Sequence, residues 1–174
     1  AINLHGNVHD VVVQNSYFQN TGDDIYVLWG EDLNPGNVTF QDCTGVNPGI
    51  LCPNWYGNCG ATYGLQSIVF ANITCKAPTL KQPIPQPGGN VSRIDNSMFV
   101  FYTSFGGKYP QGNSITIKGW TFEDLEGKVY TAQEGSMDRP DKSHKMVWTK
   151  AENGKNAPFY FPNKKQQVNV YATQ

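Results

Sequence analysis

The sequence predicts an all-β protein that folds as a parallel β-helix, a solenoid in which short strands stack as successive rungs. Four segments share one pattern, in which a polar start precedes an alternating, β-branched run that ends at Asn, Asp or Gly. No segment of ten residues has the periodicity of a helix. The repeated segments are HDVVVQNSYFQNT from His9, GNVTFQDCTGV from Gly36, QSIVFANITC from Gln66 and NSITIKGWTFEDLEG from Asn113.

Each repeated segment contributes one equivalent apolar position, and these positions are separated by steps of 27, 30 and 47 residues. A rung of this length cannot bury its inner face alone, so we expect the rungs to stack. Asn suits the corners, because it adopts left-handed backbone and can form a ladder with the Asn of the next rung. The equivalent positions are Val11, Val38, Ile68 and Ile115.

The 47-residue step must contain a long excursion, which Lys76–Asn90 supplies with four prolines and two glycines. Those residues exclude regular structure there. Clear rungs are expected over residues 1–130 of a single domain spanning 1–174, followed by closing coils or a cap over 131–174. Glu134–Ser143 is polar and predicts a loop. The composition also predicts strands at Met98–Tyr102, Met146–Thr149 and Val168–Tyr171.

A β-sandwich is the competing architecture, since it also consists of short alternating strands. Its hairpins need not keep one consensus in every strand, which favours the β-helix. The first residues, Ala1–Leu4, have the pattern of the middle of a strand. We therefore expect a C-terminal portion of a longer helix, whose open end is covered by more of its own chain or by a neighbouring chain.

The cysteines and the glycosylation sequons predict a secreted, extracellular or cell-surface glycoprotein. Four cysteines lie within 33 residues. The N-x-S/T sequons are at Asn37, Asn72 and Asn90. Four cysteines allow three pairings, of which Cys52–Cys59 and Cys43–Cys75 are favoured. A zinc site is the rival, but no C-x-x-C pair is present, and the histidines (His5, His9 and His144) lie elsewhere.

The charge of the chain excludes some partners. A formal net charge of -1 and a pI near 6.3 give no electrostatic basis for binding nucleic acid. No apolar run approaches the roughly 18 residues that a membrane-spanning helix needs, so no membrane insertion is expected. No signal peptide is visible at the N-terminus.

Two adjacent aspartates, Asp23 and Asp24, follow Asn-Thr-Gly at the corner after the first repeat. Neighbours in a strand point to opposite faces, so these two can serve one site only where the chain bends, which Thr21-Gly22 permits. Paired carboxylates suit hydrolysis of a glycosidic bond without a cofactor. One protonates the leaving oxygen while the other activates a water, with about 6.5–9.5 Å between them in an inverting enzyme.

Residues 2–29, INLHGNVHDVVVQNSYFQNTGDDIYVLW, resemble the glycoside hydrolase family that contains the α-1,3-glucanases (mutanases) and mycodextranase. The resemblance implies a right-handed parallel β-helix that hydrolyses an α-glucan polysaccharide with inversion. More distantly, the NTGDD corner is similar to those of the dextranase–isopullulanase and polygalacturonase families.

By this resemblance Asp23 is the general acid and Asp24 is half of the base pair that holds the water. The other half in the family is an aspartate one rung earlier, and it would fall directly before Ala1. The family usually has Gly after the second aspartate, where this chain has Ile25. A β-branched residue does not easily adopt the positive φ that Gly allows, so the corner is expected to differ.

Several side chains are candidates for binding sugar, because aromatic faces stack on sugar rings. His5 can contact a sugar hydroxyl or a carboxylate, and its alternative is a structural role. A calcium site from the acidic residues near the corner is a further alternative. Its ligands would be Asp23, Asp24, Glu31 and Asp32. The candidate sugar-binding residues are His5, Trp29, Trp55 and Tyr56.

Two function classes therefore stay open. The first is a secreted inverting glycoside hydrolase that acts on an α-glucan. The second is a catalytically inactive, structural or carbohydrate-binding β-helix in an extracellular assembly. Fold alone does not distinguish them.

Overall fold

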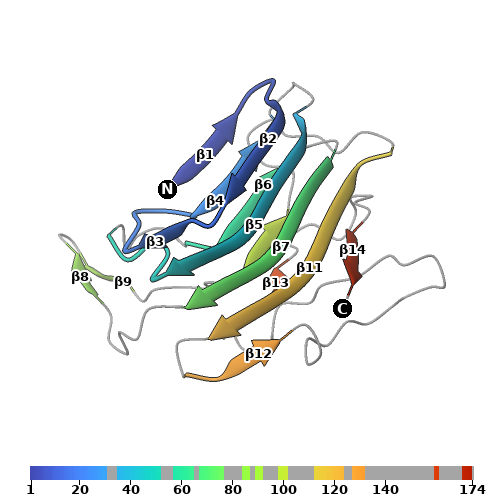
Figure 1. The fold of residues 1–174 in the computed structure, drawn as a ribbon. Helices are drawn as coiled ribbons and strands as arrows, with labels where there is room; N and C mark the ends of the chain where they lie inside the picture. Colours follow the sequence, from blue (N-terminus) through green and yellow to red (C-terminus); the bar gives the residue numbers. More distant parts are fainter. Residues whose placement is uncertain are drawn as a thin grey trace.

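The described chain forms two large sheets of mainly parallel strands, and it passes back and forth between them (Figure 1). The structure, a computed structural model, describes residues 1–30, 35–51, 57–64, 67–76, 84–86, 89–91, 98–101, 112–123, 127–131, 159–160 and 170–173. These residues form strands, turns and bends without a helix, so the described fold is all-β as predicted.

The five-stranded sheet, called sheet A, consists of short strands in the order in which they occur along the chain. Its strands are β1 (Ile2–His5), β4 (Tyr26–Trp29), β6 (Gly60–Tyr63), β10 (Phe99–Phe101) and β13 (Phe159–Tyr160). All of its neighbouring strands are parallel.

The seven-stranded sheet, called sheet B, lies in front of sheet A in Figure 1. Its main ladder runs through β2, β5, β7 and β11, which are parallel neighbours. β3 extends the ladder beside β5 and β14 extends it beside β11, whereas β12 pairs antiparallel with β11. Its strands are β2 (His9–Gln14), β3 (Tyr17–Gln19), β5 (Gly36–Val46), β7 (Ser67–Lys76), β11 (Ser114–Glu123), β12 (Val129–Thr131) and β14 (Val170–Thr173).

The register of sheet B confirms the repeat alignment. Val11 pairs with Val38, Val38 with Ile68, and Ile68 with Ile115. These are the four positions that the sequence aligned across steps of 27, 30 and 47 residues. A sandwich of antiparallel sheets, the alternative architecture, would not place these strands in parallel.

Left-handed residues bend the long strands of sheet B. Asn15, Asp42, Asn72 and Gly119 occupy one level of the ladder, and their φ angles lie between 50° and 59°. In β5 the buried positions shift by one residue at this level, from Val38 and Phe40 to Cys43 and Gly45. Side chains alternate between the two faces of a strand, so a regular strand would place Cys43 and Gly45 on the outer face. The bend instead keeps the parts of β5 before and after Asp42 facing the core.

The polar ladder expected at the corners is confirmed. Asn47 donates its side-chain Nδ2–H to Asn20 Oδ1 at 2.8 Å, and both residues have positive φ. In the same way, Asn72 donates its side-chain Nδ2–H to Asp42 Oδ1 at 2.7 Å. Short polar side chains that tolerate left-handed backbone therefore mark the corners, as the sequence predicted.

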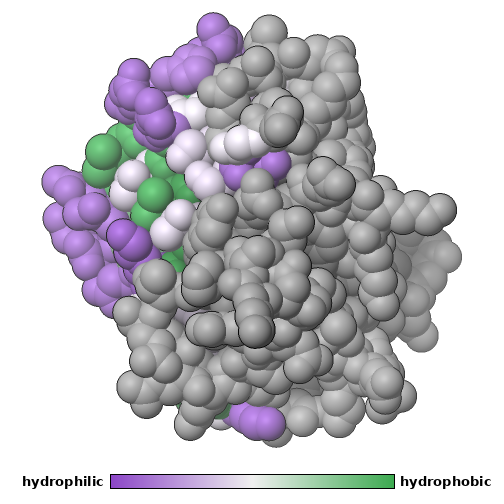
Figure 2. All heavy atoms as spheres, turned by 90° about the vertical axis from the view of Figure 1, so that its right-hand side faces the viewer, coloured by the Kyte–Doolittle hydropathy of each residue, from purple (hydrophilic) through white to green (hydrophobic). Residues whose placement is uncertain are grey.

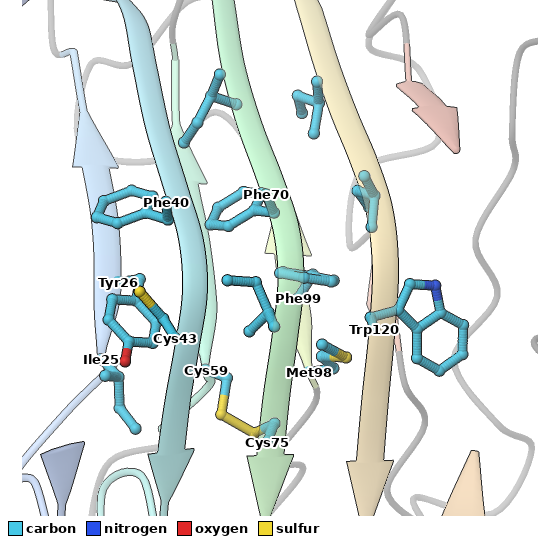
Figure 3. Close-up of a cluster of buried hydrophobic side chains, with 14 of the residues drawn as sticks. Ile25, Tyr26, Phe40, Cys43, Cys59, Phe70, Cys75, Met98, Phe99 and Trp120 are labelled. Carbon is cyan, nitrogen blue, oxygen red and sulfur yellow. A yellow bond between two sulfur atoms is a disulfide. The ribbon is translucent and has the colours of Figure 1, made fainter. Parts of the chain in front are cut away.

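The hydrophobic core lies between the two sheets and is drawn in Figure 3. A column of aromatic rings crosses it from strand to strand. Phe40 stacks on Phe70 with ring centroids 5.6 Å apart, and Phe70 lies 4.7 Å from Phe99 of sheet A. Tyr26 lies 5.4 Å from Phe40 on the other side. Side chains of both sheets thus form a single core.

The outer face of sheet B is mixed in character. Val12 and Tyr17 are exposed, at 60% and 61%. Figure 2 shows a small group of hydrophobic residues bordered by hydrophilic ones on the described surface. Scattered exposed apolar residues are ordinary on a protein surface and define no binding site by themselves.

The predicted disulfide pairing is wrong. Cys59 bonds to Cys75 across a Cα–Cα distance of 5.9 Å, and Cys43 is a free, buried thiol. In the ladder Cys43 lies beside Ile73, so its level is two residues away from that of Cys75. The bond instead joins the start of β6 in sheet A to the end of β7 in sheet B (Figure 3). Cys52 lies outside the described residues.

The proline-rich excursion was expected to lack regular structure, and this expectation is wrong in part. β8 (Ile84–Gln86) and β9 (Gly89–Val91) pair antiparallel within it. A two-stranded ribbon tolerates Pro85 because the ring can occupy a position that needs no ladder hydrogen bond.

Strands expected in the last third are found where the structure describes them. β10 lies within the predicted 98–102, and β14 overlaps the predicted 168–171. Residues 134–143 and 146–149 lie outside the described residues. In the described part, no helix has the length and apolar character that crossing a membrane requires.

Candidate functional site

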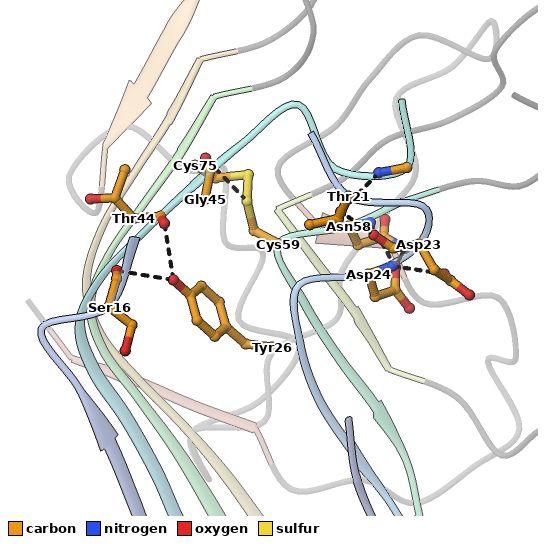
Figure 4. The surroundings of a disulfide bond; sticks show 11 residues. Ser16, Thr21, Asp23, Asp24, Tyr26, Thr44, Gly45, Asn58, Cys59 and Cys75 are labelled. Carbon is orange, nitrogen blue, oxygen red and sulfur yellow. Dashed lines mark hydrogen bonds between the residues drawn. A yellow bond between two sulfur atoms is a disulfide. The ribbon is translucent and has the colours of Figure 1, made fainter. Parts of the chain in front are cut away.

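The paired aspartates lie at the corner between β3 and β4, residues 20–25, which the loop after β5 holds in place (Figure 4). The Thr21 hydroxyl donates to the Asp23 carbonyl oxygen at 2.5 Å. The backbone N–H of Gly49 lies 3.2 Å from both the Thr21 Oγ1 and the Asp23 carbonyl oxygen. Leu51 donates its N–H to the Thr21 carbonyl oxygen at 3.1 Å. The bend predicted at Thr21-Gly22 is thus fixed by hydrogen bonds.

The two carboxylates have different surroundings. Asp23 is exposed, and its Oδ1 accepts the backbone N–H of Asp24 at 2.7 Å. Asp24 is only 5% exposed. Its Oδ1 accepts from the backbone N–H and the side-chain Nδ2–H of Asn58 at 2.6 and 2.7 Å, and its Oδ2 accepts from the Tyr63 hydroxyl at 2.6 Å. One carboxylate therefore reaches solvent and the other is enclosed.

Burial of the Asp24 carboxyl raises its pKa to about 6, because removal from water disfavours the charged form. The hydrogen bond from Tyr63 acts in the opposite direction. The negative charge of Asp23 raises the pKa further, and the two bonds from Asn58 lower it. Asp24 thus exchanges its proton close to the pH range in which general acids and bases work.

The register of sheet A defines the level of Asp24. Tyr26 pairs with Ile2 on one side and with Gly60 on the other. Counting back two residues from each puts Asn58 beside Asp24, which matches the hydrogen bonds. On the other side Ala1 N donates to the Asp24 carbonyl oxygen at 2.8 Å. The backbone of Ala1 therefore lies beside that of Asp24.

The aromatic candidates lie at the opposite end of the same strands. His5, Trp29 and Tyr63 share one level of sheet A. Ring centroids are 4.7 Å apart for His5 and Trp29, and 6.0 Å apart for Trp29 and Tyr63. His5 is exposed and Trp29 is half-buried, so the structure brings together two of the predicted sugar contacts. Trp55 and Tyr56 lie outside the described residues.

Sequence reasoning missed Asn58 and Tyr63. Tyr63 ends β6 and Asn58 lies two residues before the start of this strand, which reads GATY and lacks the alternating, β-branched pattern by which strands were recognised. The signal that could have found Asn58 is its place directly before Cys59, a residue expected to be in a disulfide. Tyr63 carries no sequence signal of its own, because its role depends on which strand lies beside β6.

The sequons that the structure describes are accessible. Asn37 and Asn72 are exposed, and their side-chain amides donate to Asp10 Oδ1 and Asp42 Oδ1 at 3.0 and 2.7 Å. Asn90 lies in β9, and its side chain is outside the described part.

Within the described ranges, no three His, Cys, Asp or Glu residues come together in a way that could hold a metal ion. Glu31 and Asp32, two ligands of the alternative calcium site, lie outside those ranges.

The comparisons with known proteins give no match: no protein-family model, no curated protein and no solved structure is similar to this chain. The case for a function rests on the corner around Asp23 and Asp24.

Proposed function

We propose that the protein is a secreted inverting glycoside hydrolase that cleaves an α-glucan, with α-1,3-glucan as its first candidate substrate. The observation that carries this proposal is the pairing of an exposed carboxylate, Asp23, with a buried one, Asp24, whose pKa is about 6. Two neighbouring carboxyl groups in different surroundings divide the roles of acid and base between them.

The proposed architecture is a right-handed parallel β-helix. It is supported by the repeated passage of the chain between sheets A and B and by the parallel ladders within each sheet. Secretion is supported by the Cys59–Cys75 disulfide and by the exposed sequons at Asn37 and Asn72.

In the proposed mechanism, the exposed Asp23 gives its proton to the oxygen of the leaving sugar. Asp24 holds the attacking water. A carboxylate has roughly four lone-pair positions. Asp24 uses three for bonds from Asn58 and Tyr63, which leaves about one on Oδ2 for the water. The base must be ionised while the acid still carries its proton, so the pH profile of activity is bell-shaped, with its rising limb near pH 6, where Asp24 ionises.

The test uses the full-length protein on α-1,3-glucan, with the release of reducing sugar and the anomer first formed as readouts. Inversion predicts the β-anomer, which NMR distinguishes from the α-anomer. Asp23→Asn should lower kcat by a factor of about 100 or more, because the proton donor is lost. The matched control is Asp42→Asn, an exposed corner position whose amide would still accept the bond from Asn72.

Full activity of the Asp23→Asn protein, or an α-anomeric first product, would contradict the proposal. An equal loss of activity in Asp42→Asn would show that the effect comes from the fold and not from the acid.

One observation favours the second candidate function, a structural or carbohydrate-binding β-helix in an extracellular assembly. The Asp24 carboxylate is enclosed, and its bonds join the corner before β4 to both ends of β6. A carboxylate that is buried and hydrogen-bonded on both oxygens in this way can have a purely structural role, which is to fix the corner. Wild-type protein that binds insoluble α-1,3-glucan in a pull-down but releases no sugar would establish this alternative.

A further inference from the structure

We propose that Tyr63 is a positioning residue for the acid–base pair: its hydroxyl fixes the direction in which the Asp24 carboxylate points, with Asn58 as its counterpart on the other oxygen. This inference rests on the proposed function. It is carried by the arrangement of hydrogen bonds around Asp24, which come from two ends of β6 and engage both oxygens.

The bonds on Asp24 restrain the carboxylate from two sides. Asn58 supplies two donors to Oδ1, one from the backbone and one from the side chain. These alone allow the group to swing about Oδ1. The Tyr63 hydroxyl holds Oδ2 at 2.6 Å and removes that freedom. The remaining lone pair of Oδ2 then points in one direction, which a base that orients a water requires.

Tyr63 can hold Asp24 because its own ring is immobilised. The residue is 7% exposed and packs in a small cluster on the face of sheet A that points away from the main core. The other members of the cluster are Val27, Ala61, Val100 and the half-buried Trp29. The ring lies 6.0 Å from that of Trp29, so one tyrosine spans the distance between the aromatic end of the strands and the acidic corner.

In the described part of the chain, few charged groups act on the Asp24 carboxylate. Those that act on Asp24 are Asp23, on the same corner, and the amino group of Ala1, whose nitrogen donates to the Asp24 carbonyl oxygen. Removal of the Tyr63 hydroxyl therefore changes one bond on Oδ2 and leaves the neighbouring charges as they are.

The decisive variant is Tyr63→Phe, which keeps the buried ring and removes only the hydroxyl. A hydrogen bond to a charged group favours the charged form, so its loss should raise the titration midpoint of Asp24 by about one pH unit or more. Carboxyl ¹³C NMR of aspartate-labelled protein measures this midpoint without any substrate. The matched control is Tyr17→Phe, an exposed tyrosine whose hydroxyl donates to Gln19 Oε1.

Kinetics on α-1,3-glucan give the second readout. Tyr63→Phe should lower kcat by about tenfold to a hundredfold with little change in KM, and it should move the rising limb of the pH profile upward. A merely structural role would lower the thermal stability and leave the pH profile where it is. Asn58→Ser, which keeps the backbone donor, should shift the midpoint in the same direction by less and serves if Tyr63→Phe does not fold.

The possible outcomes separate this inference from the proposed function. An Asp24 midpoint that is unchanged in Tyr63→Phe and in Asn58→Ser overturns the inference. A shifted midpoint in a protein whose wild type releases no sugar shows that Tyr63 holds Asp24 and that the hydrolase proposal fails. A shifted midpoint together with a shifted pH profile supports both.

Discussion

The carboxyl group of Asp24 links protonation to folding, because it is buried in the folded chain and exposed in the unfolded one. Its pKa is about 6 when folded, against an ordinary value of 3.8. A raised pKa means that the folded state holds the proton more tightly. The resulting stabilisation is fully present below about pH 4 and is lost as pH rises through about 6.

We therefore expect the contribution of Asp24 to the free energy of unfolding to fall by about 2 kcal/mol between pH 4 and pH 7. Urea denaturation at a series of pH values measures this slope. Asp24→Asn imitates the protonated form and should flatten the slope in this range. Parallel pH curves for the wild type and Asp24→Asn would show that the carboxyl does not titrate with folding.

At the scale of the strands, the approach of β5 to the core depends on a glycine. A Cβ added to Gly45 would lie 2.5 Å from Ile25 Cδ1 and 2.9 Å from Cys59 Sγ. Gly45 also pairs with Cys75 in the ladder, so it is next to both halves of the disulfide. The space that a side chain would fill is already occupied by the bond that joins the two sheets.

Gly45→Ala should destabilise the protein by about 1–3 kcal/mol, the usual cost of overpacking a core. Thermal unfolding followed by circular dichroism measures the loss. Gly112→Ala is not a suitable comparison, because its φ of 84° adds strain of its own. Thr44→Ala, on the neighbouring half-buried position of β5, is the better control and should cost less. If Gly45→Ala and Thr44→Ala lost equal stability, the close packing of Gly45 against Ile25 and Cys59 would be contradicted.

The strands also show what a sequence can predict. The ladder of Val11, Val38 and Ile68 was predictable, because their alternating, β-branched neighbours and polar corners recur in each segment. β6 was not predictable, since it is buried along its whole length and begins with a glycine. A Cβ at Gly60 would lie 2.5 Å from Phe99 Cδ1, so packing against β10 selects the glycine and removes the usual strand signal.

The candidate site likewise contains residues that the sequence could predict and residues that it could not. Asp23 and Asp24 were recognisable because adjacent carboxylates after Asn-Thr-Gly are a local feature of the sequence. Asn58 and Tyr63 were not, since they reach Asp24 only through the pairing of β4 with β6 across 34 and 39 residues. The disulfide escaped prediction for the same reason: its two halves meet through the core and not along one sheet.

For the whole molecule, the Cys59–Cys75 bond is a covalent cross-link between the two sheets. It closes a loop between residues 16 positions apart, for which the entropy of the unfolded chain predicts a stabilisation of about 3 kcal/mol. Because Asn58 directly precedes Cys59, the bond also anchors the residue that holds Asp24 (Figure 4).

Reduction with dithiothreitol should lower the thermal midpoint of the wild type, and Cys59→Ser/Cys75→Ser should show the lower midpoint with or without the reductant. Cys43→Ser is the matched control, because Cys43 is free and its variant keeps the disulfide. A wild type that does not respond to reduction, or peptide mapping that finds Cys43 in a bond, would contradict this pairing.

The ladder of sheet B also bears on how such a chain can diversify. Equivalent positions keep their register whether 27 residues separate them, as from Val11 to Val38, or 47, as from Ile68 to Ile115. Twenty additional residues (47 minus 27) are thus accommodated without disturbing the hydrogen-bonded framework. Insertions and deletions in the connections can therefore accumulate and reshape the surroundings of the acidic corner, while the stacked strands that position it stay the same.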